Sequence, residues 1–231
     1  MNNTNTTPPI GYKKSAIGII PNDWEIKKLG EISHSRNSSL SINQLTNNSG
    51  IYPLYGAGNI IQYIDFFEQE ERYISIIKDG AGVGRVLKCE SNSSIVGTMS
   101  YIFPKQNNNL DYLFYVLDSI SFEKYITGST IPHIYFKDYS SEKIPVPPLP
   151  EQQKIAEILS TWDDAIATCK KTIDTLEDRN KGLAQQLLSG KIRLSGFSEK
   201  WNKTELGKIS KRVTAKNEEL NDTVVTISAQ R

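Results

Sequence analysis

A seam of apolar residues runs through residues 155–187, with successive members alternately four and three positions apart. This spacing averages 3.5 residues, the repeat of a coiled-coil helix, and it predicts one long helix over residues 151–190. At ~1.5 Å per residue, residues 151–189 would extend roughly 60 Å. The polar member, Asn180, lowers stability but can fix the register of a helix pair. The predicted seam consists of Ile155, Leu159, Trp162, Ile166, Cys169, Ile173, Leu176, Asn180, Leu183 and Leu187.

Charged residues flank the seam closely, for example at Asp163, Lys170 and Glu177, so the apolar stripe is narrow. A narrow stripe fits one partner helix, although a long core helix of a globular bundle is the alternative interpretation. The sequence offers no second long amphipathic helix, because the helix predicted over residues 111–126 is too short to cover the seam. We therefore expect the partner to be another molecule, or sequence beyond Arg231.

The residues ahead of the long helix have the pattern of a mixed domain, and the predicted fold class is α+β: a mixed-sheet domain followed by the coiled-coil helix. Short β-branched or aromatic runs at 73–77, 86–87 and 100–103 predict strands. The polar segment 1–18 is predicted to be a flexible leader, and residues 19–150 to be the domain. Four prolines between 145 and 150 predict a stiff, extended connector at its end.

An internal repeat predicts how the chain is organised. Five residues of segment 24–33 recur at identical offsets in segment 201–210: Trp, Leu, Gly, Ile and Ser. The first copy opens the domain and the second copy follows the helix. The plan is therefore domain–helix–domain, in which residues 191–231 begin a truncated second domain.

Composition and motifs exclude several classes of protein. Met1–Pro9 lacks the apolar core of a signal peptide, and no run approaches 18 apolar residues, so we expect a cytoplasmic protein. Cys89 and Cys169 alone build no disulfide framework. No spacing predicts a metal site, and neither His34 nor His133 stands in the frame of a catalytic triad. We predict neither a cofactor nor catalysis, and the net charge of +1 does not by itself suggest nucleic acid.

The glycine-rich segment Lys78–Arg85 allows two interpretations. A loop for phosphate or S-adenosylmethionine would have to open a helix, whose N-terminal amides hold the anion. The strand-like residues Val86 and Leu87 follow instead. A strand–turn–strand unit, with glycines at positive φ, is favoured.

Polar and aromatic side chains gather in the predicted loops. Amide, hydroxyl and guanidinium groups can read base edges, and Lys and Arg can contact phosphate. Exposed loops are polar in most proteins, however, so residue type alone is weak evidence. The candidate DNA-contacting residues are Arg36, Asn37, Tyr55, Asn59, Lys78, Arg85, Thr98, Ser129, Thr130 and His133.

Several segments resemble specificity subunits of type I restriction-modification systems. The most specific is Ile144–Ala156, which is similar to the end of a target-recognition domain of that family and the beginning of its long helix. Together the similar segments cover most of residues 19–190. The others are Ile20–Trp24, Leu29–Glu31, Tyr52–Gly58, Lys78–Gly80, Gly97–Met99 and Gly128–Ile134.

The resemblance implies a non-catalytic protein. In the family, each recognition domain reads half of a bipartite target, mainly through the major groove, and two antiparallel helices set the gap between the halves. Methylation subunits bring S-adenosylmethionine, and a restriction subunit brings ATP-driven translocation and nuclease activity. This chain departs from that pattern, because its second domain is a stub and its second helix is absent.

We therefore expect the chain to bind a half-site on double-stranded DNA, to scaffold methylation and restriction subunits, and to form a two-fold homodimer through its helix. One alternative is a coiled-coil scaffold protein whose globular domain binds protein. Another is a free-standing methyltransferase, for which the sequence shows no cofactor motif.

Overall fold

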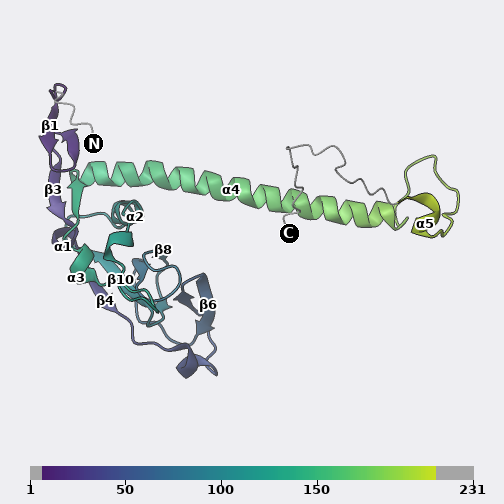
Figure 1. The fold of residues 1–231 in the computed structure, drawn as a ribbon, viewed down its shortest axis with the longest axis horizontal. Coiled ribbons are helices and arrows are strands. Elements are labelled where there is room, and N and C mark those ends of the chain that lie inside the picture. The colour runs from purple at the N-terminus through teal and green to yellow at the C-terminus, as the bar shows by residue number, and fades with distance from the viewer. Residues whose placement is uncertain (1–6, 212–231) are drawn as a thin grey trace, which may run out of the picture. The chain divides into compact units, whose positions relative to one another are not determined.

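The computed structural model of the chain describes residues 7–211. Residues 1–6 and 212–231, which include parts of the predicted leader and of the predicted second domain, lie outside the described residues. The chain divides into two compact units, and the division falls between Thr168 and Cys169, inside the long helix α4 (Leu149–Leu188) (Figure 1). The predicted fold class is confirmed, because the first unit combines helices with parallel and antiparallel strand pairs.

The strands of the first unit form two sheets and two separate strand pairs. The largest sheet is antiparallel and has the order β4 (Ser33–Asn37), β10 (Met99–Pro104), β7 (Tyr73–Ile77), β8 (Val86–Cys89). The second sheet has the order β6 (Asn59–Ile64), β5 (Tyr52–Gly56), β9 (Ser94–Ile95). The two pairs are β3 (Glu25–Lys28) with β11 (Lys143–Val146), and the hairpin of β1 (Tyr12–Ser15) and β2 (Gly18–Pro21).

The hydrophobic core has two parts that cover opposite faces of the four-stranded sheet. Side chains alternate along β7, so Ile74 and Ile76 join a cluster with helix α2, while Tyr73 and Ile77 join a cluster with β5 and β9. All five residues of β7 are buried. The continuous apolar run at 73–77 is thus explained, since a strand covered on both faces has no exposed side.

Three short helices complete the first unit, and the structure corrects one sequence prediction about them. They are α1 (Leu29–Ile32), α2 (Leu110–Asp118) and α3 (Phe136–Tyr139). The helix predicted over 111–126 was wrong at both ends. Asn109 caps α2 through a hydrogen bond from the Tyr112 backbone N–H (2.8 Å), whereas Asp111, the first residue of the predicted helix, forms ion pairs with Arg72 and Lys88.

The structure also changes both ends of the predicted domain. The expected extended connector is partly a strand, because β11 pairs with β3 across more than 110 positions of sequence. Helix α4 begins at Leu149, two residues earlier than predicted. Pro150 fits this start, since first-turn N–H groups have no partner within the helix. The predicted leader is folded from Tyr12, where β1 of the hairpin begins.

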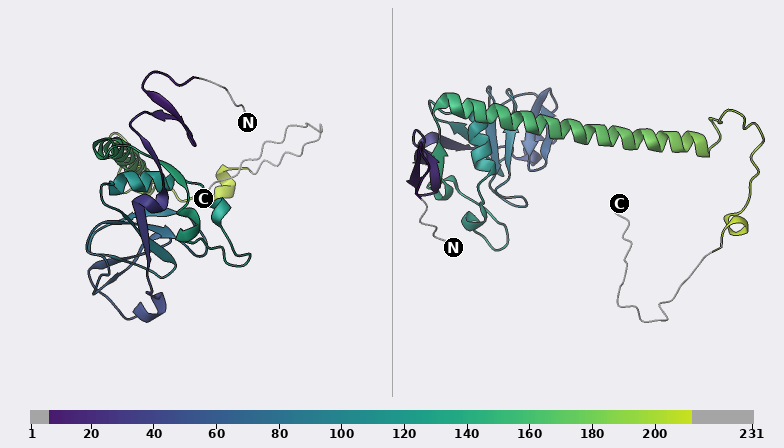
Figure 2. Two further views of the ribbon diagram at one scale, coloured as in Figure 1. Left: turned by 90° about the vertical axis from the view of Figure 1, so that its left-hand side faces the viewer. Right: turned by 90° about the horizontal axis from the view of Figure 1, so that it is seen from above.

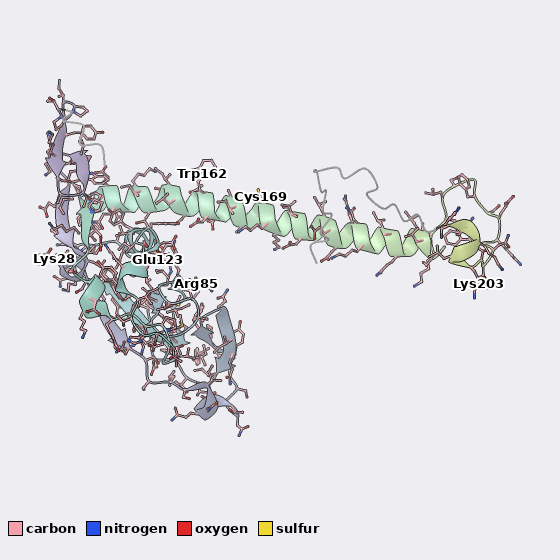
Figure 3. All side chains as sticks on the ribbon, viewed as in Figure 1. Lys28, Arg85, Glu123, Trp162, Cys169 and Lys203 are labelled. Atoms are coloured by element: carbon pink, nitrogen blue, oxygen red, sulfur yellow. The ribbon has the colours of Figure 1, made fainter. Side chains whose placement is uncertain are left out.

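Helix α4 has 40 residues, of which only Gln152 and Ala156 are buried. Ile155 is partly buried and packs against the core of the domain, so the first predicted seam residue is covered by its own chain. Most of the seam beyond it is exposed, including Trp162 at 67% and Ile173 at 56%. Trp162 and Cys169 lie along this helix in Figure 3. Within residues 7–211, no helix has the length and apolar character needed to cross a membrane.

The second copy of the sequence repeat repeats the local structure of the first. Both copies form a single helical turn, α1 and α5 (Leu206–Ile209), and the serine that follows each turn donates to the turn's first carbonyl at 2.8 Å. Their surroundings differ. Leu29 is fully buried, whereas Leu206 is 74% exposed. The repeat therefore encodes the turn itself, and burial in the first copy comes from the domain around it.

Candidate nucleic-acid interface

One end of the four-stranded sheet collects several of the predicted contact residues. Because neighbouring strands are antiparallel, the last residues of β4 and β7 and the first residues of β8 and β10 lie at the same end. The register places Ser100 opposite Asn37, Met99 opposite Ile77, and Val86 opposite Ile76. Three segments therefore leave the sheet at this same end: residues 38–41, 78–85 and 97–98.

The glycine-rich segment between β7 and β8 is a turn, as the sequence predicted. Gly80, Gly82 and Gly84 all have φ between 85° and 88°, a region that favours glycine. The chain re-enters the sheet at once, since Arg85 and Ile77 are joined by a backbone hydrogen bond of 3.0 Å. The segment opens no helix, so it lacks the N-terminal amides of a phosphate-binding loop.

A second loop, residues 126–134, is fastened to this turn by backbone hydrogen bonds. The Gly80 amide donates to the Pro132 carbonyl (2.9 Å), and the Ile134 amide donates to the Lys78 carbonyl (2.9 Å). Thr127 and His133 exchange two backbone hydrogen bonds of 2.8 and 2.9 Å, which close the loop on itself. Ser129 and Thr130 lie in its exposed tip.

The turn between β5 and β6 lies near the same end of the four-stranded sheet. The guanidinium group of Arg85 donates to the Ala57 carbonyl at 3.1 Å, which holds this turn beside the 78–85 segment. Asn59 follows in the turn with φ of 144°, an unusual value for a residue other than glycine. The structure thus brings together loops that are more than 70 positions apart in sequence.

Most of the predicted contact residues are available on this surface. Asn37, Asn59, Arg85, Thr98, Ser129 and Thr130 are exposed, and Lys78 and His133 are half-buried. Lys78 is partly neutralised, because its ammonium group lies 3.2 Å from the Asp79 carboxylate. Arg85 makes no ion pair with any residue in the described part of the chain. Its guanidinium group is therefore the strongest available donor at this edge (Figure 3).

Two predicted contact residues have partners within the domain: Tyr55 is buried, whereas Arg36 stays exposed. Tyr55 is only 4% exposed, its hydroxyl accepts a hydrogen bond from the Glu90 amide, and burial raises its pKa. Arg36 lies 4.5 Å above the Tyr101 ring and donates to the side chain of Gln69. Residue type and loop position had suggested both, but neither reveals a partner that is distant in sequence.

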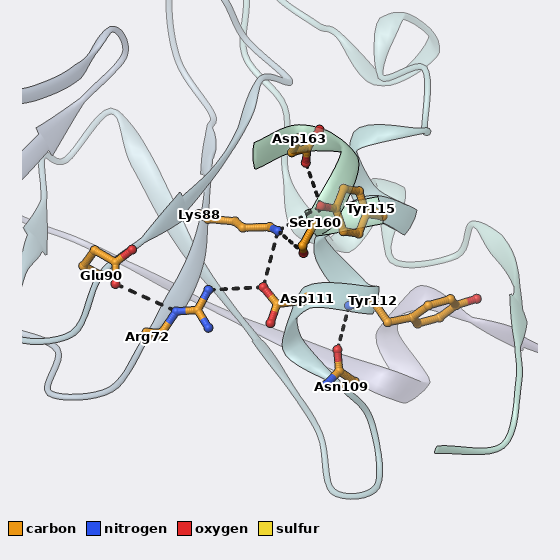
Figure 4. Close-up of polar contacts among 9 residues, drawn as sticks. All are labelled: Arg72, Lys88, Glu90, Asn109, Asp111, Tyr112, Tyr115, Ser160 and Asp163. Carbon is orange, nitrogen blue, oxygen red and sulfur yellow. Dashed lines mark hydrogen bonds and ion pairs between the residues drawn. The ribbon is translucent and has the colours of Figure 1, made fainter. Parts of the chain in front are cut away.

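A polar network that the sequence prediction missed attaches α4 to the domain (Figure 4). The Lys88 ammonium group pairs with Asp111 (3.4 Å) and donates to the hydroxyl of Tyr115 (3.3 Å) and to Ser160 of α4 (3.5 Å). The Tyr115 hydroxyl also donates to Asp163 at 2.6 Å. Strand β8, helix α2 and helix α4 are thereby joined through one cation. Only the three-dimensional pairing brings these residues together, so no local pattern announces the network.

A buried amide attaches the first turn of α4. Gln152 is 1% exposed. Its side-chain oxygen accepts a hydrogen bond from the backbone N–H of Asn109 (2.9 Å), and its side-chain nitrogen donates to the Pro147 carbonyl (2.9 Å). Beside it, the Trp24 indole donates to Glu151 at 2.9 Å. The orientation of the helix on the domain is therefore set by directional polar contacts as well as by packing.

Neither a metal cluster nor an exposed cysteine lies at the candidate interface in the described part of the chain. Among residues 7–211, no group of three or more His, Cys, Asp or Glu side chains could hold a metal ion. Burial raises the pKa of the Cys89 thiol to about 11, which keeps it protonated near neutral pH. The side chains at the candidate interface can form hydrogen bonds and carry charge.

Comparison with known proteins gives a consistent result. The family model described as "Type I restriction modification DNA specificity domain" matches residues 21–178, which is more than half of the chain. The type I restriction enzyme MjaVIII specificity subunit of Methanocaldococcus jannaschii is 30% identical over 205 residues, covering 82% of this chain and 47% of that subunit. The MjaIX specificity subunit of the same organism is 28% identical, covering 72% and 44%. The chain spans about half the length of these curated relatives.

Solved structures resemble the fold as well. The S subunit of a type I restriction-modification system from M. genitalium aligns with a TM-score of 0.59 and 21% identity, over 72% of this chain and 46% of that one. The HsdS subunit from Thermoanaerobacter tengcongensis aligns with a TM-score of 0.51 and 18% identity, over 78% and 47%. At these identities the likeness concerns the fold.

Proposed function

This chain belongs to the family of type I restriction-modification DNA specificity domains, and from that premise we propose that residues 19–150 form a target-recognition domain that reads one half of a bipartite DNA target. The observation that carries the proposal is the convergence of three loops and two turns at one end of the four-stranded sheet. Their exposed amide, hydroxyl and guanidinium groups are those that read base edges in the major groove.

Within this surface the residues divide into two roles. Arg85 can present two parallel N–H donors to guanine O6 and N7, the commonest base-specific contact. Asn37, Asn59 and Thr98 are exposed polar groups around it that can take further base contacts. Lys78 contributes positive charge toward phosphate, which sets position along the duplex but carries no sequence information.

The remainder of the chain acts as a spacer and scaffold in this proposal. Residues 151–190 pair through the exposed seam with the same helix of a second copy, antiparallel as the family resemblance implies, and residues 191–231 belong to a second domain. Two copies then present two recognition domains at a fixed separation and read an interrupted palindrome. Methylation and restriction subunits dock on this scaffold and supply catalysis, while this chain is non-catalytic and acts in the cytoplasm, where these subunits and the DNA meet.

DNA reading is tested by selecting duplexes from a random-sequence pool with the purified chain and then measuring affinity at rising salt. A domain that contacts phosphates loses affinity steeply as salt increases. We expect Arg85→Ala to weaken binding to the selected duplex by 1–3 kcal/mol, roughly 5- to 150-fold, and to relax the preference at one base pair. Arg72→Ala is the matched control, since Arg72 lies just before the first residue of β7, at the end of the sheet away from the candidate interface. Binding that does not respond to salt would favour the protein-binding scaffold.

Helix pairing is tested by light scattering at micromolar concentration. Leu176→Glu places a charge in the seam and should convert the dimer to a monomer, because an unpaired buried charge costs several kcal/mol. Gln185→Glu adds the same charge outside the seam and should remain a dimer. A wild-type chain that is strictly monomeric would refute the pairing while leaving DNA reading open to the previous test.

A further inference from the structure

The segment that follows α4 carries an organised apolar surface. The chain turns back after the end of α4 (Figure 1), and Gly190 has a positive φ of 72° there. Side chains between Leu187 and Trp201 line an open cleft of about 240 Å³. The segment is held in place by Arg193, which donates to the Glu199 carbonyl at 2.9 Å and lies 5.3 Å above the Trp201 ring. Its apolar side chains remain largely exposed, at 64% for Leu194, 66% for Phe197 and 55% for Trp201. We call residues 191–201 the arm.

A second exposed apolar surface lies at the other terminus, on the β1–β2 hairpin. Side chains alternate along each strand, so the register places Tyr12, Ile19 and Pro21 on one face together with Lys14, and Ile20 on the other. Ile20 is buried, whereas Tyr12 is 47% and Ile19 is 43% exposed. The Tyr12 face therefore points away from the domain. A two-stranded hairpin is marginally stable alone, and no third strand pairs with this one among residues 7–211.

The hairpin is fixed close to the start of α4. The Asn22 amide donates to the Gly11 carbonyl (2.9 Å), and two residues later the Trp24 indole is bonded to Glu151 in the first turn of the helix. Figure 1 and Figure 2 both show the hairpin at that end of α4. Any molecule that lies along the seam up to Ile155 therefore meets the hairpin next.

The seam determines which segment arrives there. Its steps of four and three read the same in both directions, so all ten positions of two antiparallel copies align when Leu187 of one lies opposite Ile155 of the other. Leu187 is the last seam residue and also lines the cleft of the arm. The arm of one copy thus continues the paired surface toward the hairpin of its partner.

We propose that the arm of one copy packs through Leu194, Phe197 and Trp201 onto the Tyr12 and Ile19 face of the hairpin of a second copy, which rests on the proposed helix pairing. Two symmetric contacts follow, each covering apolar surface that both segments otherwise leave in water.

Cysteine cross-linking between differently substituted full-length chains tests the contact. In a Cys169→Ala background, Ile19→Cys and Phe197→Cys chains are mixed and mildly oxidised. A disulfide-linked heterodimer should form in the mixture and in neither chain alone. Lys13→Cys is the matched control, because Lys13 lies on the opposite hairpin face, beside Ile20, and should not cross-link to Phe197→Cys.

A second measurement gives the strength of the contact. Phe197→Ser and Ile19→Ser should each weaken dimerisation about tenfold, and the double variant should weaken it less than the product of the two, because both remove one contact. Light scattering on the same samples separates the possible failures. A dimer without the Ile19–Phe197 cross-link overturns the arm contact and leaves the helix pairing intact, whereas a monomer overturns both.

Discussion

Replacing Gln152 by alanine should destabilise the domain far more than the same change one residue later. Gln152 is 1% exposed and satisfies the Asn109 amide and the Pro147 carbonyl, both at 2.9 Å. Gln152→Ala leaves the Asn109 backbone N–H and the Pro147 carbonyl without this hydrogen-bond partner, at a place that water reaches poorly. Each unsatisfied group costs about 1–3 kcal/mol, so the expected loss is about 3 kcal/mol out of roughly 5–15 kcal/mol of total stability.

Urea unfolding followed by far-UV circular dichroism measures this loss. With a slope of about 2 kcal/mol per molar urea, a loss of about 3 kcal/mol lowers the midpoint by roughly 1.5 M. The neighbouring Gln153 is exposed, so Gln153→Ala should change stability by less than about 0.5 kcal/mol. Gln152→Glu should also destabilise, since its carboxylate would face the Pro147 carbonyl without a proton to donate. Equal midpoints for Gln152→Ala and Gln153→Ala would refute the assignment of this amide as the helix anchor.

Two further predictions concern the rest of the domain. The ammonium group of Lys124 lies 2.7 Å from the Glu142 carboxylate and holds the pKa of that carboxyl below its ordinary 4.5. The stability that the ionised carboxylate adds to the fold is therefore present above pH 4.5 and is lost as the pH falls through the lowered pKa. Glu142→Gln should therefore lower stability at pH 7, by up to about 1 kcal/mol, and match wild type in strong acid; thermal melts across pH check this. Gly84→Ala should cost more than Gly80→Ala, because both have positive φ but only at Gly84 does an added Cβ meet a neighbour, Phe122 at 2.9 Å; urea midpoints that do not differ would contradict this.

Local periodicity predicted much of the fold. The three-four seam identified α4 to within two residues at either end, and the run at 73–77 marked the central strand. The glycines of 78–85 predicted a turn, because the strand-like residues after them left no helix for a phosphate site. These patterns are properties of neighbouring residues, and backbone geometry imposes them wherever the chain lies.

Long-range pairing was beyond the sequence argument. The prolines at 145 and 147 discourage helix but do not reveal that β11 pairs with β3. Asp111 has the residue type of a helix cap, yet its carboxylate forms ion pairs with Lys88 of β8 and with Arg72, which precedes β7. Similarly, residue type gives no sign that the exposed Arg36 side chain lies over the Tyr101 ring and donates to Gln69. Each case turns on a partner that only the folded sheet brings close.

The two faces of α4 explain how half-site spacing can follow from helix pairing. Residues that contact the domain, such as Gln152, Ala156, Ser160 and Asp163, share one side of the helix. At 100° per residue, this side lies roughly a quarter turn from the seam. From Leu159 onward, a partner helix can therefore pair along the seam without displacing the domain. Because Gln152 and the Lys88 network fix the domain on its own face, the register of the proposed helix pair would determine the separation of the two proposed recognition surfaces.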